Sequence, residues 1–169
     1  MTRRLRAAAL GFSVIAALGL GACSKDSDLA DASAYGAGGA GGGASTPGSA
    51  QDFVVNVGDR VFFESDSTDL SPTATATLDK QAAWLQRYPR YTFIIEGHAD
   101  ERGTREYNFS LGARRAQSVF DYLSTRGIAS GRMRTVSYGK ERPVAVCNDI
   151  SCWSQNRRAV IVLDRGAGA

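Results

Sequence analysis

The pattern of apolar and polar positions predicts a first helix from Pro72 to about Arg87. Ser71 can cap the free amide groups at its start, and proline is favoured at the first helical position. The proline at position 89 biases the residue before it away from helical geometry, so the helix ends there. Three apolar residues recur at intervals of three and four and face inward: Leu78, Ala82 and Leu85.

A second and longer helix is predicted from about Arg105 to Thr125. Gly127 follows it as the glycine that commonly ends a helix. Residues four apart lie on the same face of a helix, so one stripe can be followed along its whole length. The members of that stripe are Leu111, Arg115, Val119 and Leu123.

One member of this stripe is charged. Arg115 lies on the side that faces the core, and a buried guanidinium without a partner strongly destabilises a fold. Asp100, at the end of the preceding strand, is the candidate partner. Two interpretations stay open from these residues alone. The two side chains form a plain structural ion pair, or they stand at the rim of a pocket that binds a small zwitterionic group.

Four stretches have the β-branched and aromatic residues of strands, at 54–63, 91–97, 132–138 and 157–163. A long loop, 139–156, precedes the last of them. The order of elements is therefore β-α-β-α-β-β, and strands linked through helices favour right-handed crossovers. This order predicts an α/β (α+β) fold, a two-layer sandwich with two helices packed on one face of a mixed sheet.

Residues 1–22 have the pattern of a secretory leader, with a basic start and an apolar core too short for a permanent membrane span. Small residues precede Cys23, which resembles a bacterial lipoprotein signal in which this cysteine becomes the acylated N-terminus. The alternative is a plain signal peptide cut after an alanine. Acyl chains on Cys23 would hold the protein on a membrane. Ser24 rather than an aspartate follows the cysteine. In the enterobacterial lipoproteins that this signal resembles, the absence of aspartate permits sorting to the outer membrane, so we expect the domain to face the periplasm.

The chain then divides into a linker and one folded domain. Residues 23–50, the lipidated N-terminus and a Gly/Ala/Ser-rich stretch with a glycine-rich run at 36–43, have little apolar surface to bury, so we expect a flexible linker. Residues 51–169 form the domain that carries the function.

The charge of the chain argues against nucleic-acid binding. The formal net charge is +3, with 20 basic and 17 acidic residues. Arg3, Arg4 and Arg6 lie in the leader and account for that whole excess. Nucleic-acid binding needs a basic patch that displaces counterions, and the rest of the chain is balanced.

Two cysteines remain in the domain. Cys147 and Cys152 are expected to form a disulfide, because an exported protein meets an oxidising compartment. The rival interpretation is a metal site. It is weak, because His98 is the single histidine and four residues between cysteines is not a usual zinc spacing. We expect no metal and no cofactor.

Four polar segments fall where loops meet strand ends. Loops at one edge of a rigid sheet are the usual place for binding groups, so these segments are expected to meet in one site. They are residues 64–67, 98–104, 108–115 and 156–158.

Four motifs occur in order: GHADERGT at 97–104, N-x-x-L-x-x-x-R-A-x-x-V-x-x-x-L at 108–123, SYGKERP at 137–143 and NRRA at 156–159. Together they resemble the peptidoglycan-associated lipoprotein branch of the OmpA-like domain superfamily. The resemblance extends from about Val61 to Val162, which is nearly the whole folded region, and the motifs stand behind a lipoprotein leader.

The resemblance implies non-covalent binding of the peptidoglycan stem peptide at diaminopimelate. Asp100 matches the family's aspartate that contacts diaminopimelate, and Arg115 matches the arginine that contacts its carboxylate. A satisfied turn residue is an equal interpretation of His98, and a core position is the stronger one for Leu111. The positions that the match assigns to the site are Asp66, Ser67, His98, Asp100, Asn108, Leu111, Arg115 and Arg157.

The resemblance also implies partners, namely the Tol system with its propeller protein TolB, and a role in envelope integrity and constriction at cell division. An adaptor between periplasmic proteins, without wall binding, is one alternative. The other is a wall-acting glycan hydrolase that uses Glu64, Asp100 or Glu101. Nothing in the sequence sets two of these carboxylates at the separation that hydrolysis requires, so we expect no enzyme.

Overall fold

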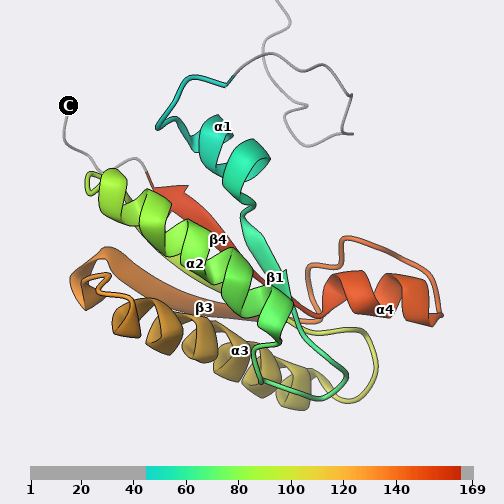
Figure 1. The fold of residues 1–169 in the computed structure, drawn as a ribbon. Coiled ribbons are helices and arrows are strands. Elements are labelled where there is room, and N and C mark those ends of the chain that lie inside the picture. Colours follow the sequence, from blue (N-terminus) through green and yellow to red (C-terminus); the bar gives the residue numbers. More distant parts are fainter. Residues whose placement is uncertain (1–44, 165–169) are drawn as a thin grey trace, which may run out of the picture. The chain divides into compact units, whose positions relative to one another are not determined.

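The computed structural model describes residues 45–164. The predicted leader, Cys23 and the glycine-rich run at 36–43 lie outside this range. Within it, no helix combines the length and the apolar character needed to cross a membrane. Figure 1 shows the elements in chain order: α1 (Ala50–Asp52), the π-helical turn η1 (Phe53–Val57), β1 (Arg60–Phe62), α2 (Pro72–Arg87), β2 (Thr92–His98), α3 (Arg105–Thr125), the 3-10 turn η2 (Ser130–Arg132), β3 (Met133–Gly139), α4 (Ile150–Asn156) and β4 (Arg158–Asp164).

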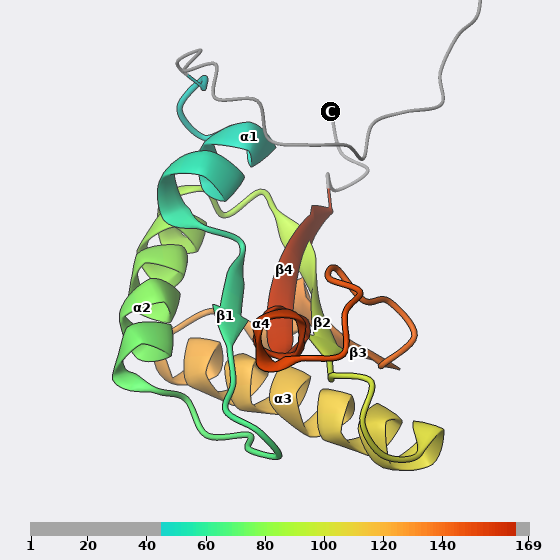
Figure 2. The same ribbon diagram turned by 90° about the vertical axis from the view of Figure 1, so that its right-hand side faces the viewer.

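The strands of the described region form one mixed sheet in the order β1-β4-β2-β3. β2 and β3 are parallel and are joined through α3, whereas β4 is antiparallel to both β1 and β2. Figure 2 shows α2 and α3 on the same side of this sheet. The predicted α+β sandwich is confirmed. The chain order alone did not show that the last strand inserts between the first two.

The hydrophobic core lies between the sheet and these two helices. Phe93 and Ile95 of β2 alternate with outward-facing neighbours and are almost fully buried. The predicted inward side of α2 and the last two residues of the α3 stripe join them in one cluster. The helical members of the cluster include Leu78, Ala82, Leu85, Val119 and Leu123.

Both long helices have the predicted bounds, because local side chains cap them. Ser71 Oγ accepts a hydrogen bond from the Ala74 amide at 3.2 Å, and Thr104 Oγ1 accepts one from the Tyr107 amide at 3.2 Å. Each satisfies one amide that a helix start leaves free. Gly127 ends α3 with a φ of 83°, a left-handed conformation that glycine adopts without strain.

Two glycines bring α3 unusually close to the sheet. A Cβ built on Gly97 of β2 would lie 1.8 Å from the carbonyl oxygen of Gly112 on α3. A Cβ on Gly112 would lie 2.8 Å from the carbonyl oxygen of Gly97. Only glycine at both positions permits this contact. The close approach places Arg115, one helical turn further along α3, against the end of β2.

The strand predicted at 54–63 is wrong in its first half. The structure has a helical turn at Phe53–Val57, and the strand is limited to Arg60–Phe62. Phe53 is fully buried, with its ring 4.9 Å from that of Trp84 on α2. The turn lets Phe53 reach this position while Val54 and Val55 face solvent.

The packed structure also begins before Ala50, where sequence patterns end the linker. The carbonyl oxygen of Gly48 accepts hydrogen bonds from the Tyr91 hydroxyl at 2.8 Å and from Arg90 Nη2 at 2.6 Å. Ser49 caps α1 by accepting from the Asp52 amide at 3.0 Å. These contacts join the end of the expected linker to the domain.

The loop predicted at 139–156 contains the short helix α4. Asp149 caps this helix by accepting from the Ser151 amide at 2.8 Å. Cys147 and Cys152 are joined by a disulfide, with their Cα atoms 5.6 Å apart. Their sulfur atoms are bonded to each other, so neither offers a thiolate to a metal beside Asp149. Seven residues carry too little periodicity to distinguish this helix from a loop in the sequence.

Candidate functional site

Arg115 is the most deeply buried charge near the loop ends. Its side chain is fully enclosed and its guanidinium donates to three backbone carbonyls. Nε donates to Ser67 at 2.9 Å, Nη1 to His98 at 2.9 Å and Nη2 to Glu64 at 3.0 Å. The guanidinium also stands 5.2 Å from the centre of the Phe63 ring. One side chain of α3 therefore joins the end of β2 to the segment that follows β1.

A direct ion pair between Arg115 and Asp100, one of the two interpretations that the sequence left open, does not form. Carbonyl oxygens satisfy the guanidinium instead, and the carboxylate is engaged elsewhere. Burial, and then the neighbouring charge of Arg157, lower the pKa of Arg115 to about 10, so the group remains cationic at neutral pH. Sequence patterns could show that this arginine needs partners, but not that backbone atoms would supply them.

Asp100 is held by two other arginines. Arg102 makes a two-pronged contact, with Nη2 2.7 Å from Oδ2 and Nε 3.1 Å from Oδ1. Arg157 Nη1 stands 3.4 Å from Oδ2 on the buried side. Burial acts to raise the pKa of Asp100, but the hydrogen bonds from Arg102 and Arg157 outweigh it and lower that pKa below its ordinary value. The carboxylate is thus ionised in neutral solution.

A pocket of about 260 Å³ opens at Asp100, between the loop after β1, the loop after β2 and the start of α3. Its size suits the end of an amino acid rather than a large ligand. Carboxylates and a guanidinium line it together. The lining residues are Ser65, Asp66, Asp100, Arg102, Gly103, Tyr107, Asn108 and Leu111.

Specific hydrogen bonds hold the walls of this pocket in place. Asp66 adopts a left-handed backbone conformation with a φ of 57° and accepts a hydrogen bond from the Tyr107 hydroxyl. The Asn108 amide Nδ2 donates to the carbonyl oxygen of Arg102 at 2.6 Å. The helix start is thereby tied to both loops that face it, and the carboxylates of Asp66 and Asp100 stand in one pocket.

Larger pockets exist in the described region. One of about 480 Å³ runs along β1 beside α2, and one of about 330 Å³ lies against the disulfide loop. Asp66, Asp100 and Asn108 line neither of them. Chemistry rather than volume therefore identifies the pocket at Asp100 as the candidate site.

The expected site residues fall into three groups. Asp66, Asp100, Asn108 and Leu111 line the pocket. Ser67, Arg115 and Arg157 stand behind its wall, where Ser67 acts through its carbonyl oxygen and Arg157 through Asp100. His98 alone points elsewhere.

The side chain of His98 faces away from the pocket, and this corrects its expected ligand contact. It is 1% exposed and stacks on the Tyr138 ring at a centroid distance of 5.6 Å. Burial, then the charges of Arg158, Arg142 and Arg60, lower the pKa of His98 to about 3. The imidazole is therefore neutral. His98 contributes to the site through its backbone carbonyl oxygen, which accepts a hydrogen bond from Arg115.

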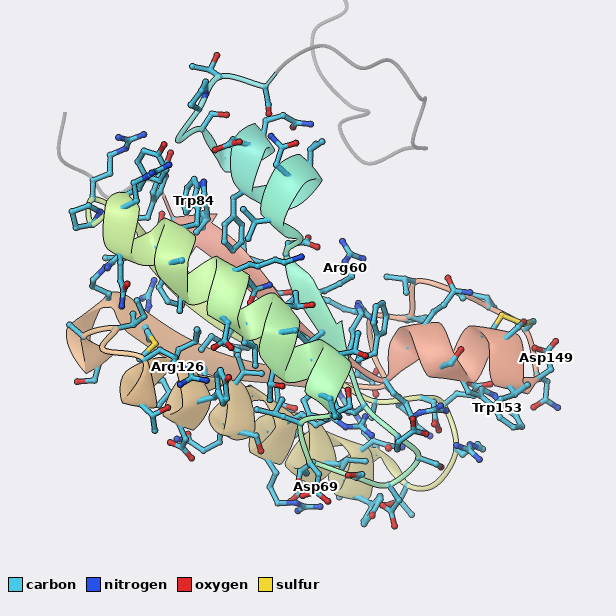
Figure 3. All side chains as sticks on the ribbon, in the orientation of Figure 1. Arg60, Asp69, Trp84, Arg126, Asp149 and Trp153 are labelled. Carbon is cyan, nitrogen blue, oxygen red and sulfur yellow. A yellow bond between two sulfur atoms is a disulfide. The ribbon has the colours of Figure 1, made fainter. Side chains whose placement is uncertain are left out.

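Arg102 and Tyr107 line the pocket but were not selected from the sequence. Arg102 belongs to the polar segment 98–104 and follows Asp100 by only two residues, whereas Tyr107 falls just outside the polar segments. Trp153 of α4 supports Arg102 from outside, with its ring centre 4.3 Å from the guanidinium carbon. Its indole Nε1 donates to the Glu101 carboxylate. Figure 3 shows Trp153 on the α4 side of the domain.

Comparison with known proteins places this geometry in a class. The OmpA family model matches residues 62–157, which contain the pocket, both long helices, β2 and β3, but only the last residue of β1 and none of β4. A crystal structure of the peptidoglycan-associated lipoprotein from Burkholderia pseudomallei is 42% identical, with a TM-score of 0.61 over 63% of this chain and 90% of that one. The C-terminal domain of Helicobacter pylori MotB has a TM-score of 0.60 at 23% identity, and so shows the fold alone.

The sequence relatives narrow that class. The peptidoglycan-associated lipoprotein of Rhizobium meliloti is 61% identical over 158 residues, which cover 93% of this chain and 88% of the relative. That of Brucella melitensis is 65% identical over 130 residues, 77% of each. The chain therefore belongs to the OmpA family and, within it, to the peptidoglycan-associated lipoproteins.

Proposed function

We propose that the domain binds the stem peptide of peptidoglycan without a covalent bond, at the free end of diaminopimelate. The pocket at Asp100 is the observation that carries this proposal, because it combines the ionised carboxylate of Asp100 with a guanidinium in the space of an amino-acid end. Diaminopimelate presents an ammonium and a carboxylate on one carbon. Charge-assisted hydrogen bonds to both groups would be complementary to that end.

Each charge has a role in this proposal. Asp100, with Asp66 across the pocket, receives the ammonium group of the ligand. Arg115 has no exposed surface, so it acts by position: it fixes the carbonyls on either side of Asp66 and places a positive charge behind the wall. Asn108 holds the Asp100–Arg102 loop against the helix start.

The relatives and the predicted leader support a wider role. We propose that acylated Cys23 anchors the chain in the outer membrane and that the domain binds peptidoglycan on the periplasmic side. The protein would then tether membrane to wall as part of the Tol system, with TolB among its partners, and would support the envelope during constriction. The names of the relatives support the wall contact.

Sedimentation with purified sacculi tests the wall contact. Asp100→Ala removes the carboxylate, and charged hydrogen bonds of this kind contribute about 1.5–3 kcal/mol, so we expect an affinity loss of about tenfold or more. Asp121→Ala on the exposed face of α3 is the matched control and should sediment like the wild type. Equal sedimentation of the Asp100 variant would overturn the proposal. Release of muropeptides by the wild type would indicate a hydrolase instead.

A further inference from the structure

The pocket already contains a cation of the protein itself. Arg102 covers the carboxylate that the proposed function assigns to the ligand ammonium, with Nη2 at 2.7 Å and Nε at 3.1 Å. The same Nη2 donates to the hydroxyl of Ser65 on the facing loop at 2.9 Å. The guanidinium thus spans the pocket from one loop to the other in the position where a ligand ammonium would bind.

We propose that Arg102 determines the specificity of this site by acting as an exchangeable counter-ion. In the free protein it neutralises Asp100. When an amino-acid end binds, the ligand ammonium takes Asp100 and the released guanidinium takes the ligand carboxylate. This inference rests on the proposed function and adds a residue to it that selects between ligands.

The backbone at Arg102 is fixed, whereas its side chain is partly exposed to solvent. Asn108 holds the Arg102 carbonyl, and Lys140 Nζ donates to the carbonyls of Glu101 at 3.1 Å and Gly103 at 2.7 Å. The side chain, in contrast, is 43% exposed, against 9% for that of Asp100. Exchange therefore needs a side-chain rotation and no unpacking of the core.

A second support for the guanidinium exists beside the pocket. The ring of Trp153 lies 4.3 Å from the Arg102 guanidinium carbon, within the range of a cation–π contact. The hydrogen bond between Trp153 and Glu101 sets the orientation of that ring. Arg102 can therefore leave Asp100 and keep a favourable partner, which lowers the cost of the exchange.

This exchange separates two kinds of ligand. A plain amine that takes Asp100 leaves Arg102 without its carboxylate, so the ligand gains one charged contact at the expense of another. A ligand with both ammonium and carboxylate restores both pairs. Loss of one charged hydrogen bond corresponds to about a tenfold or greater change in affinity, so the preference for the zwitterionic end should reach this order.

Titration with two synthetic stem peptides tests the proposal. One ends in meso-diaminopimelate, and the other has lysine at that position, which keeps the ammonium and lacks the carboxylate. Calorimetry compares the wild type with the variants Arg102→Gln and Arg102→Lys. Arg134→Gln is the control, because the Arg134 side chain on β3 is 70% exposed and does not line the pocket. Denaturant unfolding of each variant verifies its fold.

We expect the wild type and the Arg134 control to prefer the diaminopimelate peptide by about tenfold or more. Arg102→Gln should bind the lysine peptide more tightly than the wild type does, so that the preference collapses. Arg102→Lys keeps the positive charge but loses the planar guanidinium, so its preference for the diaminopimelate peptide should lie between those of the wild type and Arg102→Gln. An unchanged preference in Arg102→Gln, or weaker binding of the lysine peptide, overturns the role of Arg102. If the wild type binds neither peptide, the proposed function itself fails.

Discussion

At the scale of single residues, the molecule depends on one arginine whose partners are all backbone atoms. The three carbonyls that Arg115 holds belong to two different segments, and one planar fork reaches all of them. An ammonium group is a compact point charge and cannot span the same three positions. The same hydrogen bonds therefore stabilise the domain and hold the segments that shape its pocket.

Arg115→Lys is therefore expected to lower both stability and wall binding. Breaking a buried, hydrogen-bonded charge typically costs several kcal/mol, and we expect a loss of about 2–4 kcal/mol in the free energy of unfolding. Denaturant unfolding and sedimentation with sacculi measure the two effects. Arg114→Lys, on the exposed neighbour that contacts Ser110, should change neither. Full wall binding by a destabilised Arg115 variant would show that the carbonyl contacts do not shape the pocket.

The buried histidine predicts a pH dependence of stability. Burial and nearby arginines lower the pKa of His98 to about 3 in the folded protein, against an ordinary pKa of 6.5. Between these values the unfolded chain binds a proton that the folded chain does not, so stability falls as pH decreases from 6.5 toward 3. The slope of this contribution reaches at most about 1.4 kcal/mol per pH unit.

His98→Phe should remove that contribution while keeping a ring against Tyr138. Denaturant unfolding of both proteins between pH 5 and pH 7 measures the difference in slope, and the carboxylates, which the two proteins share, cancel. The same slope in both would mean that His98 is protonated in the fold, where Glu96 Oε2 stands 3.5 Å from Nε2.

At the scale of elements, the position of α3 on the sheet depends on the absence of two side chains. Gly97→Ala would place a methyl group 1.8 Å from the carbonyl oxygen of Gly112, so strand and helix must separate. Overpacking of this kind costs about 1–3 kcal/mol, and more when backbone rather than a flexible side chain must move. We expect at least about 3 kcal/mol less stability in denaturant unfolding.

Gly131→Ala is the matched control for this prediction, because a Cβ at Gly131 would meet nothing within 4 Å. Wild-type stability of the Gly97 variant would show that α3 can shift at little cost. Such a result would contradict the prediction, because a displaced α3 would also break the Arg115 contacts on which stability depends.

Local chemistry explains which elements the sequence predicted well. The two long helices have serine or threonine caps and a closing glycine or proline within a few residues, so their bounds were predictable. The turn at Phe53–Val57 was not, because its apolar residues equally fit a strand, and only the pocket for Phe53 beside Trp84 decides between the two. Local propensity yields to tertiary packing in such segments.

At the scale of the whole molecule, the proposed tether has two ends that can be separated. Cys23→Ala would abolish acylation, so we expect the chain to leave the membrane fraction while its domain still sediments with sacculi. The Asp100→Ala variant should show the opposite behaviour. Fractionation of cells measures membrane anchoring, and sedimentation of the purified chain with sacculi measures wall binding. Retention of the Cys23 variant in the membrane would contradict lipid anchoring through this residue.

The sequence by itself determined the class of fold, both long helices, and half of the residues that line the pocket, because caps, periodicity and loop position are local properties. The tertiary structure decided the pairing of charges. Arg115 was expected to meet Asp100, yet it binds carbonyl oxygens, and Arg102 and Arg157 hold the carboxylate. Which acceptor a buried guanidinium reaches depends on how segments far apart in the chain converge in space. The spacing of residues along the sequence does not report these spatial distances.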